Sequence, residues 1–265
     1  MAEERYASAL LESRYSRRAV SGERYAVVSC HVERPLDDDV WARFSAVQQQ
    51  RPGGFPIAAL VRPADPAAGE DADLWLERAR EASERGPFGH HTHWTAPDHA
   101  RPTTGGTGEL VLAEGTRFRE LGLAPTLFCG GGWYTDEDVA EACAELGYVD
   151  CTPRATRPPY LAEGERWASL QAPQRVRLAS GRTLTALPTT HSLGDLGRAL
   201  TRRSLPDVVH VYFHDTDLLS RRRSLALHVL LGRLARRARV TDLDALAATV
   251  AEHTSEVGWD DVARL

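Results

Sequence analysis

The stretch "YAVVSCHVERPLDDDVWARFSAVQQQ" (residues 25–50) contains the unit that decides the fold. Its first nine residues are rich in apolar and β-branched side chains, which favours a strand. From residue 36 the apolar positions change to helical spacing, with Val40, Phe44 and Val47 on one face. The stretch therefore predicts a strand followed directly by a helix, the unit from which parallel sheets are built.

The same alternation continues along the chain. Further strands are expected at 55–61, 86–94, 148–152 and 207–215, and residues 124–134 are expected to form a strand followed by a glycine-rich turn. Further helices are expected at 71–85, 108–123, 135–147, 192–204 and 220–238. Between residues 153 and 190 the alternation breaks, and a hairpin turning at Ser180-Gly181 is expected there. About seven strand–helix units favour an α/β protein with a single distorted (β/α)7-type barrel.

The helix expected at 135–147 has sequence signals at both ends. Thr135 is a suitable N-cap, because its hydroxyl can accept a hydrogen bond from the first turn. The acidic residues that follow suit the positive end of the helix dipole. Gly147 fits the left-handed position that commonly follows a helix.

Composition limits the class of protein and its partners. Of 265 residues, 42% are hydrophobic and 26% charged, and the net charge of -5 argues against nucleic acid or a membrane as partner. No segment resembles a signal peptide or a membrane span, and the four cysteines lack C-x-x-C spacing, so a cytoplasmic protein without disulfides is expected. The barrel domain is expected over residues 25–250, with an N-terminal helical extension (1–24) and a C-terminal tail (251–265). The oligomeric state is left open.

Histidines and acidic residues gather where the expected strands end. The first strand ends in His31-Val32-Glu33 and the third in His91-Thr92-His93. Since successive side chains of a strand alternate between faces, Glu33 shares a face with His31, and His91 shares one with His93. Imidazole nitrogens with a carboxylate oxygen are the usual ligands of Zn²⁺. Glu33, His91 and His93 are therefore expected to hold one divalent ion, most simply Zn, with Co, Ni, Mn or Fe as alternatives.

For other residues near these histidines, a functional role is weighed against a structural one. His90 is expected to point away from His91 and His93, and His99 lies in a polar loop. The stretch "FCGGGWY" (128–134) fits neither of the phosphate-binding glycine patterns and is interpreted as a tight turn that brings backbone close to a ligand.

The order of these motifs resembles the polysaccharide deacetylase (NodB-like carbohydrate esterase) family. "GHHTHWT" (89–95) matches the family's G-x-H-[ST]-x-x-x-H, except that Thr95 stands near where the second histidine belongs, with His93 and His99 as the nearest candidates. "VHVYFHDTD" (209–217) matches the strand that ends in L-L-H-D. "SCHVERP" (29–35) stands at the first motif, with histidine and glutamate in place of two aspartates.

The resemblance implies a fold and an activity. The family has a distorted (β/α)7 barrel and removes acetyl groups from sugars with one divalent metal. By resemblance, His31 is the general base, and His214 is the general acid, oriented by Asp215 or Asp217. The substrate is then an acetylated amino sugar or small glycoconjugate, either a small molecule or an oligosaccharide. Backbone N–H groups near 128–134 would stabilise the oxyanion.

The side chains expected to contact the substrate are Trp94, Trp133, Tyr134 and Asp217.

Departures from the family in the first and third motifs leave alternatives open. The family's Arg-Pro-Pro segment is absent near the fourth strand, and "TRPPY" (156–160) follows the fifth. If His31 were a fourth metal ligand, the site would be closed and structural. The alternatives are a catalytically degenerate binding protein of the same fold, or a metal enzyme that runs a non-hydrolytic reaction.

Overall fold

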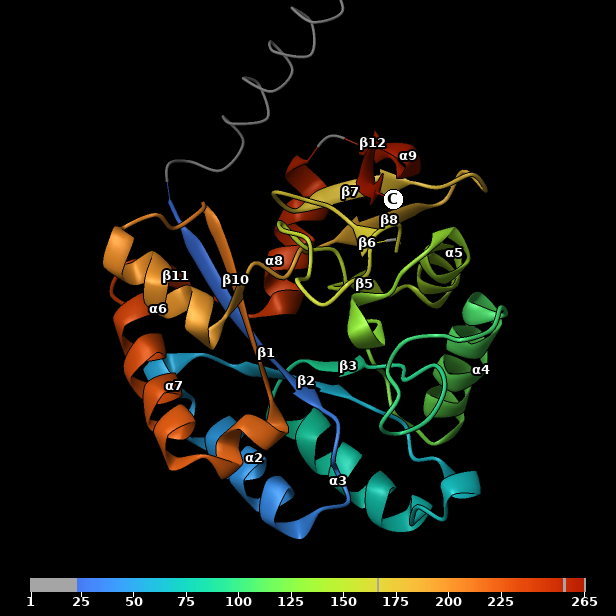
Figure 1. Cartoon of the computed structure of the whole chain (residues 1–265), viewed down its shortest axis with the longest axis horizontal. Coiled ribbons are helices and arrows are strands. Elements are labelled where there is room, and N and C mark those ends of the chain that lie inside the picture. The colour runs from blue at the N-terminus through green and yellow to red at the C-terminus, as the bar shows by residue number, and fades with distance from the viewer. Residues whose placement is uncertain (1–22, 166, 255, 265) are drawn as a thin grey trace, which may run out of the picture.

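A computed structural model describes residues 23–165, 167–254 and 256–264. Most of the expected N-terminal extension (1–22) lies outside the described residues. The fold is α/β, with a mostly parallel central sheet and helices packed against it (Figure 1).

The strands of the central sheet follow one another in an order set by crossover connections. That order is β12 (Glu256–Gly258), β7 (Gln174–Arg177), β8 (Thr183–Ala186), β5 (Val149–Asp150), β4 (Leu127–Phe128), β3 (Phe88–His90), β2 (Ile57–Val61), β1 (Tyr25–Val32), β10 (Val208–His214) and β9 (His191–Ser192). Beside this path, β11 (Arg239–Val240) pairs with β1. The β7–β8 pair is antiparallel, whereas the other pairs of this sheet are parallel.

The helices follow the strands much as the sequence predicts. They are α2 (Asp38–Gln50), α3 (Ala72–Arg85), α4 (Thr107–Glu120), α5 (Glu137–Leu146), α6 (Leu193–Arg202), α7 (Arg221–Leu234), α8 (Leu243–His253) and the short α9 (Trp259–Val262). Figure 1 shows α2, α3, α6 and α7 on the outer side of β1, β2 and β10, with α4 and α5 beside β3 to β5.

Side chains of β1 point alternately to the two faces of the sheet, and each face packs against a different part of the core. Ala26, Val28, Cys30 and Val32 pack into the core formed with the outer helices. Val27 and the residues in phase with it face the opposite side, and Val27 belongs to a second core cluster. The side chains of β10 alternate in the same way, and Val209, Val211 and Phe213 pack into the core formed with the outer helices. The histidines of both strands therefore lie on the face turned away from α2 and α7.

The ends of α5 correct one expectation and confirm another. The N-cap is Asp136, whose carboxylate accepts a hydrogen bond from the Val139 N–H at 2.9 Å, and not Thr135. The carboxylate accepts a stronger, charge-assisted hydrogen bond than a hydroxyl does. Gly147 follows the helix with φ of 70°, as expected for a left-handed C-terminal position.

The segment after β5 contains the expected hairpin and links two parts of the sheet. β7 and β8 pair across a turn at Gly181, where φ is 84°. Residues 185–186 pair with β5, and residues 191–192 of the same segment pair with β10. Within the region 251–265 that was expected as a tail, the described residues end α8 and contribute β12 beside β7 and β13 (Ala263–Arg264) beside β6 (Trp167–Ala168).

Candidate metal centre

The candidate site lies at the carboxyl ends of β1, β3 and β10. His31 is on β1, and Glu33 follows one residue after that strand ends. His214 is the last residue of β10, directly opposite His31 in the parallel register. The third strand is shorter than expected and ends at His90, so His91 and His93 lie on the chain that leaves it. Parallel strands bring these side chains to the same edge of the sheet.

One carboxylate oxygen of Glu33 lies among three imidazoles. Glu33 Oε1 is 3.7 Å from His91 Nε2, 3.7 Å from His93 Nε2 and 3.6 Å from His214 Nε2. The His91 and His93 rings are 5.0 Å apart and nearly perpendicular. These separations are longer than a hydrogen bond, so the four atoms surround a common space without bonding each other directly.

Both of these histidines are held by backbone carbonyls. His91 Nδ1 donates to the Cys129 carbonyl at 2.7 Å, and His93 Nδ1 donates to the Pro97 carbonyl at 2.7 Å. A carbonyl only accepts, so the Nδ1 atoms carry the hydrogens. Their Nε2 atoms are buried without a hydrogen-bond partner. A fixed Nδ1–H with a free Nε2 is the usual arrangement of a metal-binding histidine.

Electrostatics favour a cation at the same place. Burial, the largest effect, lowers the pKa of His91 below its usual value, so the imidazole is neutral and its Nε2 presents a lone pair. Burial alone would raise the pKa of Glu33, but its interactions with His91 and His93 and the charge of His214 hold it well below the usual range. A neutral imidazole and an ionised carboxylate thus face each other as two acceptors, an arrangement that a cation between them would stabilise.

The donor set fits Zn²⁺ or a similar ion. Bonds of about 2.1 Å in a tetrahedral arrangement would place ligand atoms roughly 3.4 Å apart. The measured separations from Glu33 Oε1 are 3.6–3.7 Å. Two groups of mutually close ligand atoms share this carboxylate: Glu33 with His91 and His93, and Glu33 with His31 and His214. The predicted ligands and the predicted base and acid thus meet at one carboxylate.

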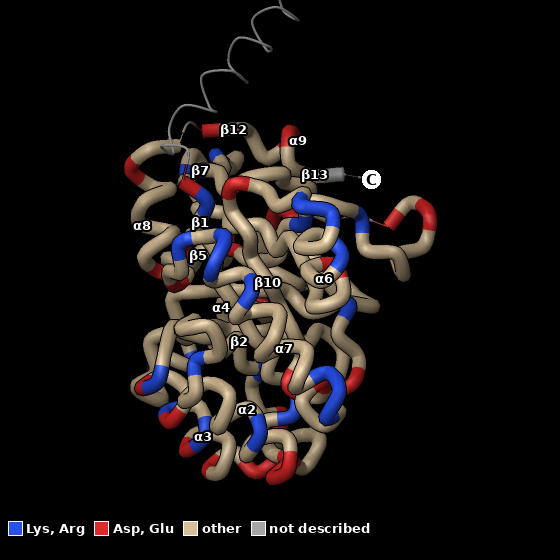
Figure 2. The backbone as a smooth tube through the Cα atoms, turned by 90° about the vertical axis from the view of Figure 1, so that its left-hand side faces the viewer, with Lys and Arg blue, Asp and Glu red and all other residues tan. Residues whose placement is uncertain are grey.

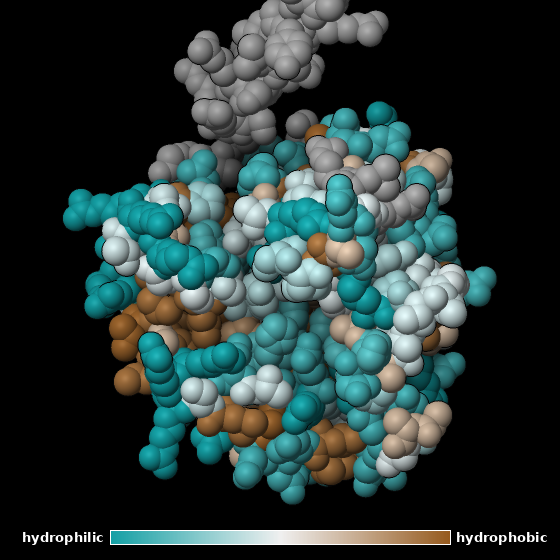
Figure 3. Space-filling model, viewed as in Figure 1, coloured by the Kyte–Doolittle hydropathy of each residue, from teal (hydrophilic) through white to brown (hydrophobic). Residues whose placement is uncertain are grey.

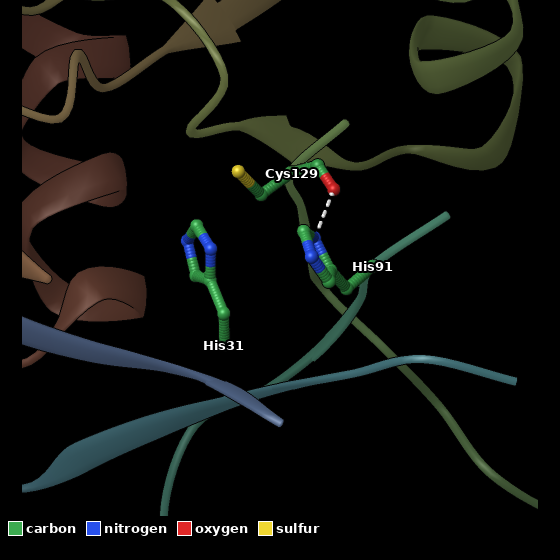
Figure 4. Close-up of side chains that lie close together, drawn as sticks. All are labelled: His31, His91 and Cys129. Carbon is green, nitrogen blue, oxygen red and sulfur yellow. Dashed lines mark hydrogen bonds between the residues drawn. The ribbon is translucent and has the colours of Figure 1, made fainter. Parts of the chain in front are cut away.

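A third group of close ligand atoms lies deeper (Figure 4). It consists of His31, His91 and Cys129, all buried, and the figure shows the hydrogen bond from His91 to the Cys129 carbonyl. Burial, followed by the charge of Asp150, raises the pKa of the Cys129 thiol well above its usual value. The thiol is therefore protonated, which makes the group around Glu33 the better cation site.

Aromatic rings surround His31, and one of them, that of Tyr212, was not predicted from the sequence to belong to the site. Its ring lies 4.6 Å from that of His91, 5.1 Å from Trp133 and 5.4 Å from Tyr212. Burial, then the charges of His91 and His214, lower its pKa well below the usual value. Its Nε2 has no hydrogen-bond partner. His31 thus presents a buried, neutral nitrogen that can accept a proton.

Trp133 adopts a backbone conformation that is rare for a large side chain. Its φ is 56°, in the left-handed region. The indole is buried between His31 and the guanidinium of Arg154, which lies 4.4 Å from the ring and 5.1 Å from Tyr212. Strain of this kind persists where surrounding contacts require it. The only sequence signal for Tyr212 was its alternation with His214, and Arg154 had none.

Most N–H groups of the glycine turn around Trp133 are already hydrogen-bonded. The Gly130 N–H donates to Thr152 Oγ1, and the Gly131 N–H donates to the Thr92 carbonyl. The Trp133 and Tyr134 N–H groups donate within the same turn. The expectation that these groups stabilise an oxyanion is therefore wrong for most of the stretch, because they already hold the turn together. The turn brings backbone against backbone: a Cβ on Gly131 would lie 2.5 Å from the Thr92 carbonyl.

Two acidic residues after β10 have different contacts. Asp215 is fully buried and accepts from the N–H groups of Arg34 and Thr216, each at 2.7 Å. It thereby joins the end of β10 to the segment after β1. Asp217 Oδ2 accepts from the His214 N–H at 3.1 Å and lies 4.0 Å from His214 Nδ1. Of the two residues, Asp217 is the one placed to orient His214.

The remaining predicted residues lie around this centre. As expected, His90 points away, and its Nε2 lies 2.7 Å from Glu114. His99 has 70% of its side chain exposed and lies outside the metal-binding groups, which favours His93 as the second histidine. Trp94 and Tyr134 contact each other with ring centres 5.4 Å apart. The rings that pack against His31 among the described residues are those of His91, Trp133, Tyr212 and His214.

Comparison with known proteins finds a distant structural similarity and no family. No protein-family model and no curated protein matches the chain. One similar solved structure is the 4-α-glucanotransferase from Thermococcus litoralis, with 12% sequence identity and a TM-score of 0.49. The match covers 89% of this chain and 39% of that enzyme, so the chain spans well under half of its length. Among the described residues, no helix has the length and apolar character needed to cross a bilayer.

Proposed function

We propose that the protein is a metal-dependent hydrolase that removes an acetyl group from an amino sugar or small glycoconjugate. The observation that carries the proposal is that imidazole nitrogens surround the carboxylate of Glu33. In two of these imidazoles, those of His91 and His93, the other ring nitrogen donates a hydrogen bond to a backbone carbonyl. Glu33, His91 and His93 would hold the ion. The choice of deacetylation rests on the motif resemblance, with His31 and His214 on the other side of the same carboxylate.

The chemistry divides among these residues. A bound Zn²⁺ would polarise the acyl carbonyl and lower the pKa of water. The Nε2 of His31, which has no hydrogen-bond partner, would accept the proton of the attacking water. His214 would deliver a proton to the departing amine nitrogen, with Asp217 holding its backbone and facing its Nδ1. The products are the free amine and acetate.

We propose the barrel form of the fold on separate grounds. The segment 183–192 pairs with β5 near its start and with β10 near its end. A single segment that touches both ends of the parallel series supports a distorted (β/α)7 arrangement. In such a barrel the active site lies at the carboxyl ends of the strands, where His31, Glu33 and His214 lie.

Metal content of the purified protein tests the ligand assignment. We expect about one equivalent of divalent metal in the wild type and loss of tight binding in His91→Ala, because a neutral imidazole ligand is removed. His99→Ala serves as the matched control, since His99 is exposed and lies outside the site. Stoichiometric metal in His91→Ala would overturn the assignment.

Acetate release from a panel of N- and O-acetylated amino sugars tests the reaction. We expect kcat to fall by about 10²–10⁴-fold in His31→Gln and in His214→Gln, with metal content unchanged, because each variant loses one proton-transfer group. Metal without acetate release by the wild type would replace hydrolysis with another metal-dependent reaction. A wild type that holds no metal would favour the degenerate binding protein.

A further inference from the structure

A large hollow extends from the candidate centre between α6 and α7. It has a volume of about 1090 Å³, and Tyr212, His214 and Asp217 line the end that meets the centre. Sites for small molecules commonly have volumes of about 300–1,000 Å³, so this hollow has room for more than an acetyl group. It is therefore suited to the part of a substrate that extends away from the reacting bond.

Arginines dominate the charge of this hollow. Arg198 and Arg202 line it from α6, one helical turn apart, and Arg222 and Arg223 line it from the start of α7. Figure 2 shows basic segments on both helices. Asp217 is the single acidic residue of the lining. Four guanidinium groups with one carboxylate favour an anion, and the planar guanidinium matches phosphate and carboxylate groups.

Two of these arginines are available to a ligand. Arg198 pairs with Asp195 at 2.5 Å, and Arg223 pairs with Asp217 at 2.5 Å. Arg202 and Arg222 have no ion pair or hydrogen bond from their side chains within the part of the chain that the structure describes. Their charges are therefore not neutralised by the protein itself.

The rest of the hollow is apolar. Leu193 from α6 and Ala226 and Leu230 from α7 line it. On the same helix Leu225 and Val229 are 67% and 45% exposed. Figure 3 shows a hydrophobic patch on the side of the molecule that carries α6 and α7. An apolar surface beside unpaired arginines matches a ligand with both an apolar segment and an anionic group.

We propose that this hollow binds an anionic group, phosphate or carboxylate, carried on an apolar segment of the substrate. The inference rests on the proposed function in one respect, since it places the acetylated end of the same molecule at the metal centre. It narrows the substrate class from acetylated sugars in general to acetylated compounds that bear an anionic, partly apolar substituent.

Calorimetric titration with octyl phosphate, octanoate and octyl glucoside tests the proposal. We expect octyl phosphate or octanoate to bind at least about tenfold more tightly than the neutral glucoside, and the tighter of the two identifies the anion. Binding should weaken with added salt, because exposed charges are screened. In Arg202→Gln/Arg222→Gln the affinity for the anionic ligand should fall at least about tenfold.

A matched double variant and a metal-site variant complete the design. Arg221→Gln/Arg233→Gln removes two exposed arginines of α7 that do not line the hollow, and should keep the wild-type affinity within about twofold. His91→Ala should also bind the anionic ligand normally, so loss of the metal and failure of the hollow are distinguishable. Unchanged affinity in Arg202→Gln/Arg222→Gln, loss of binding in His91→Ala, or no anion preference would overturn the proposal.

Discussion

Asp150, at the end of β5, is a buried carboxyl group that is only partly satisfied. It is 1% exposed; Oδ1 accepts from the Thr152 N–H at 2.8 Å, whereas Oδ2 has no partner. Burial raises its pKa from 3.8 to about 6, against the opposing effect of the Thr152 hydrogen bonds. The folded state therefore binds this proton more tightly than the unfolded state does.

This shift makes stability depend on pH. Because the folded pKa is raised, its contribution to stability is full below about pH 4 and is lost as the pH rises through about 6. Asp150→Asn cannot ionise, so the free energy of unfolding of the wild type should fall relative to the variant by about 2 kcal/mol between pH 4 and 7. Urea denaturation of both proteins across this range measures the difference. Parallel pH profiles would contradict the assignment.

At the residue scale, the sequence predicted which histidines lie together better than it predicted their surroundings. His91 and His93 were placed together by strand alternation, although the strand ends at His90 and carbonyls of other segments orient the two rings. Cys129 and Pro97 supply those carbonyls. Because every residue has a backbone carbonyl, the identity of these two residues could not predict this role. Arg154 was missed because its position depends on the irregular segment after β5, which has no periodic pattern.

At the scale of the elements, Asp136 connects α5 to its neighbours. Its carboxylate caps the helix at the Val139 N–H and also accepts from the Tyr134 hydroxyl at 2.6 Å and the Thr107 hydroxyl at 2.9 Å. Asp136→Ala should lower the free energy of unfolding by about 2 kcal/mol, since the cap and both hydroxyl contacts are lost. Chemical denaturation measures the change.

Thr135→Val is the matched control for that variant. The Thr135 hydroxyl is buried without a partner, so replacing it with a methyl group should leave stability unchanged or raise it slightly. If Thr135→Val were the more destabilising of the two, Thr135 rather than Asp136 would be the effective cap. The sequence could not distinguish these adjacent residues, because both types are good N-caps.

Long elements were predicted well and short ones less so. β1, α2, α3 and β10 lie within about two residues of their expected bounds, because apolar periodicity extends there over several turns or pleats, whereas α7 ends four residues before its expected end. β3 has three residues, far fewer than the stretch 86–94 expected as a strand, and β4 has two residues before the glycine-rich turn that was expected after it. Tertiary contacts end these strands early: the chain after β3 bends to bring His91 and His93 to Glu33, and the chain after β4 enters the glycine turn.

At the scale of the whole molecule, the candidate metal would join strands from distant parts of the sheet. Its proposed ligands follow β1 and β3, and His214 of β10 faces the same carboxylate. Removing the ion with EDTA should lower Tm by several degrees, because a ligand that binds only the folded state stabilises it by mass action. Differential scanning calorimetry measures the shift. His91→Ala should start at the lower Tm and show no further loss with EDTA.

Pairing of β1 with β10 also has a consequence for biosynthesis. Ser29 of β1 hydrogen-bonds His210 of β10 at 2.9 Å, although the two residues are 181 positions apart. At translation rates of about 5–20 residues per second, β10 leaves the ribosome roughly 10–35 s after β1. During that interval one edge of β1 has no strand beside it, and a nascent chain in this state is exposed to mispairing.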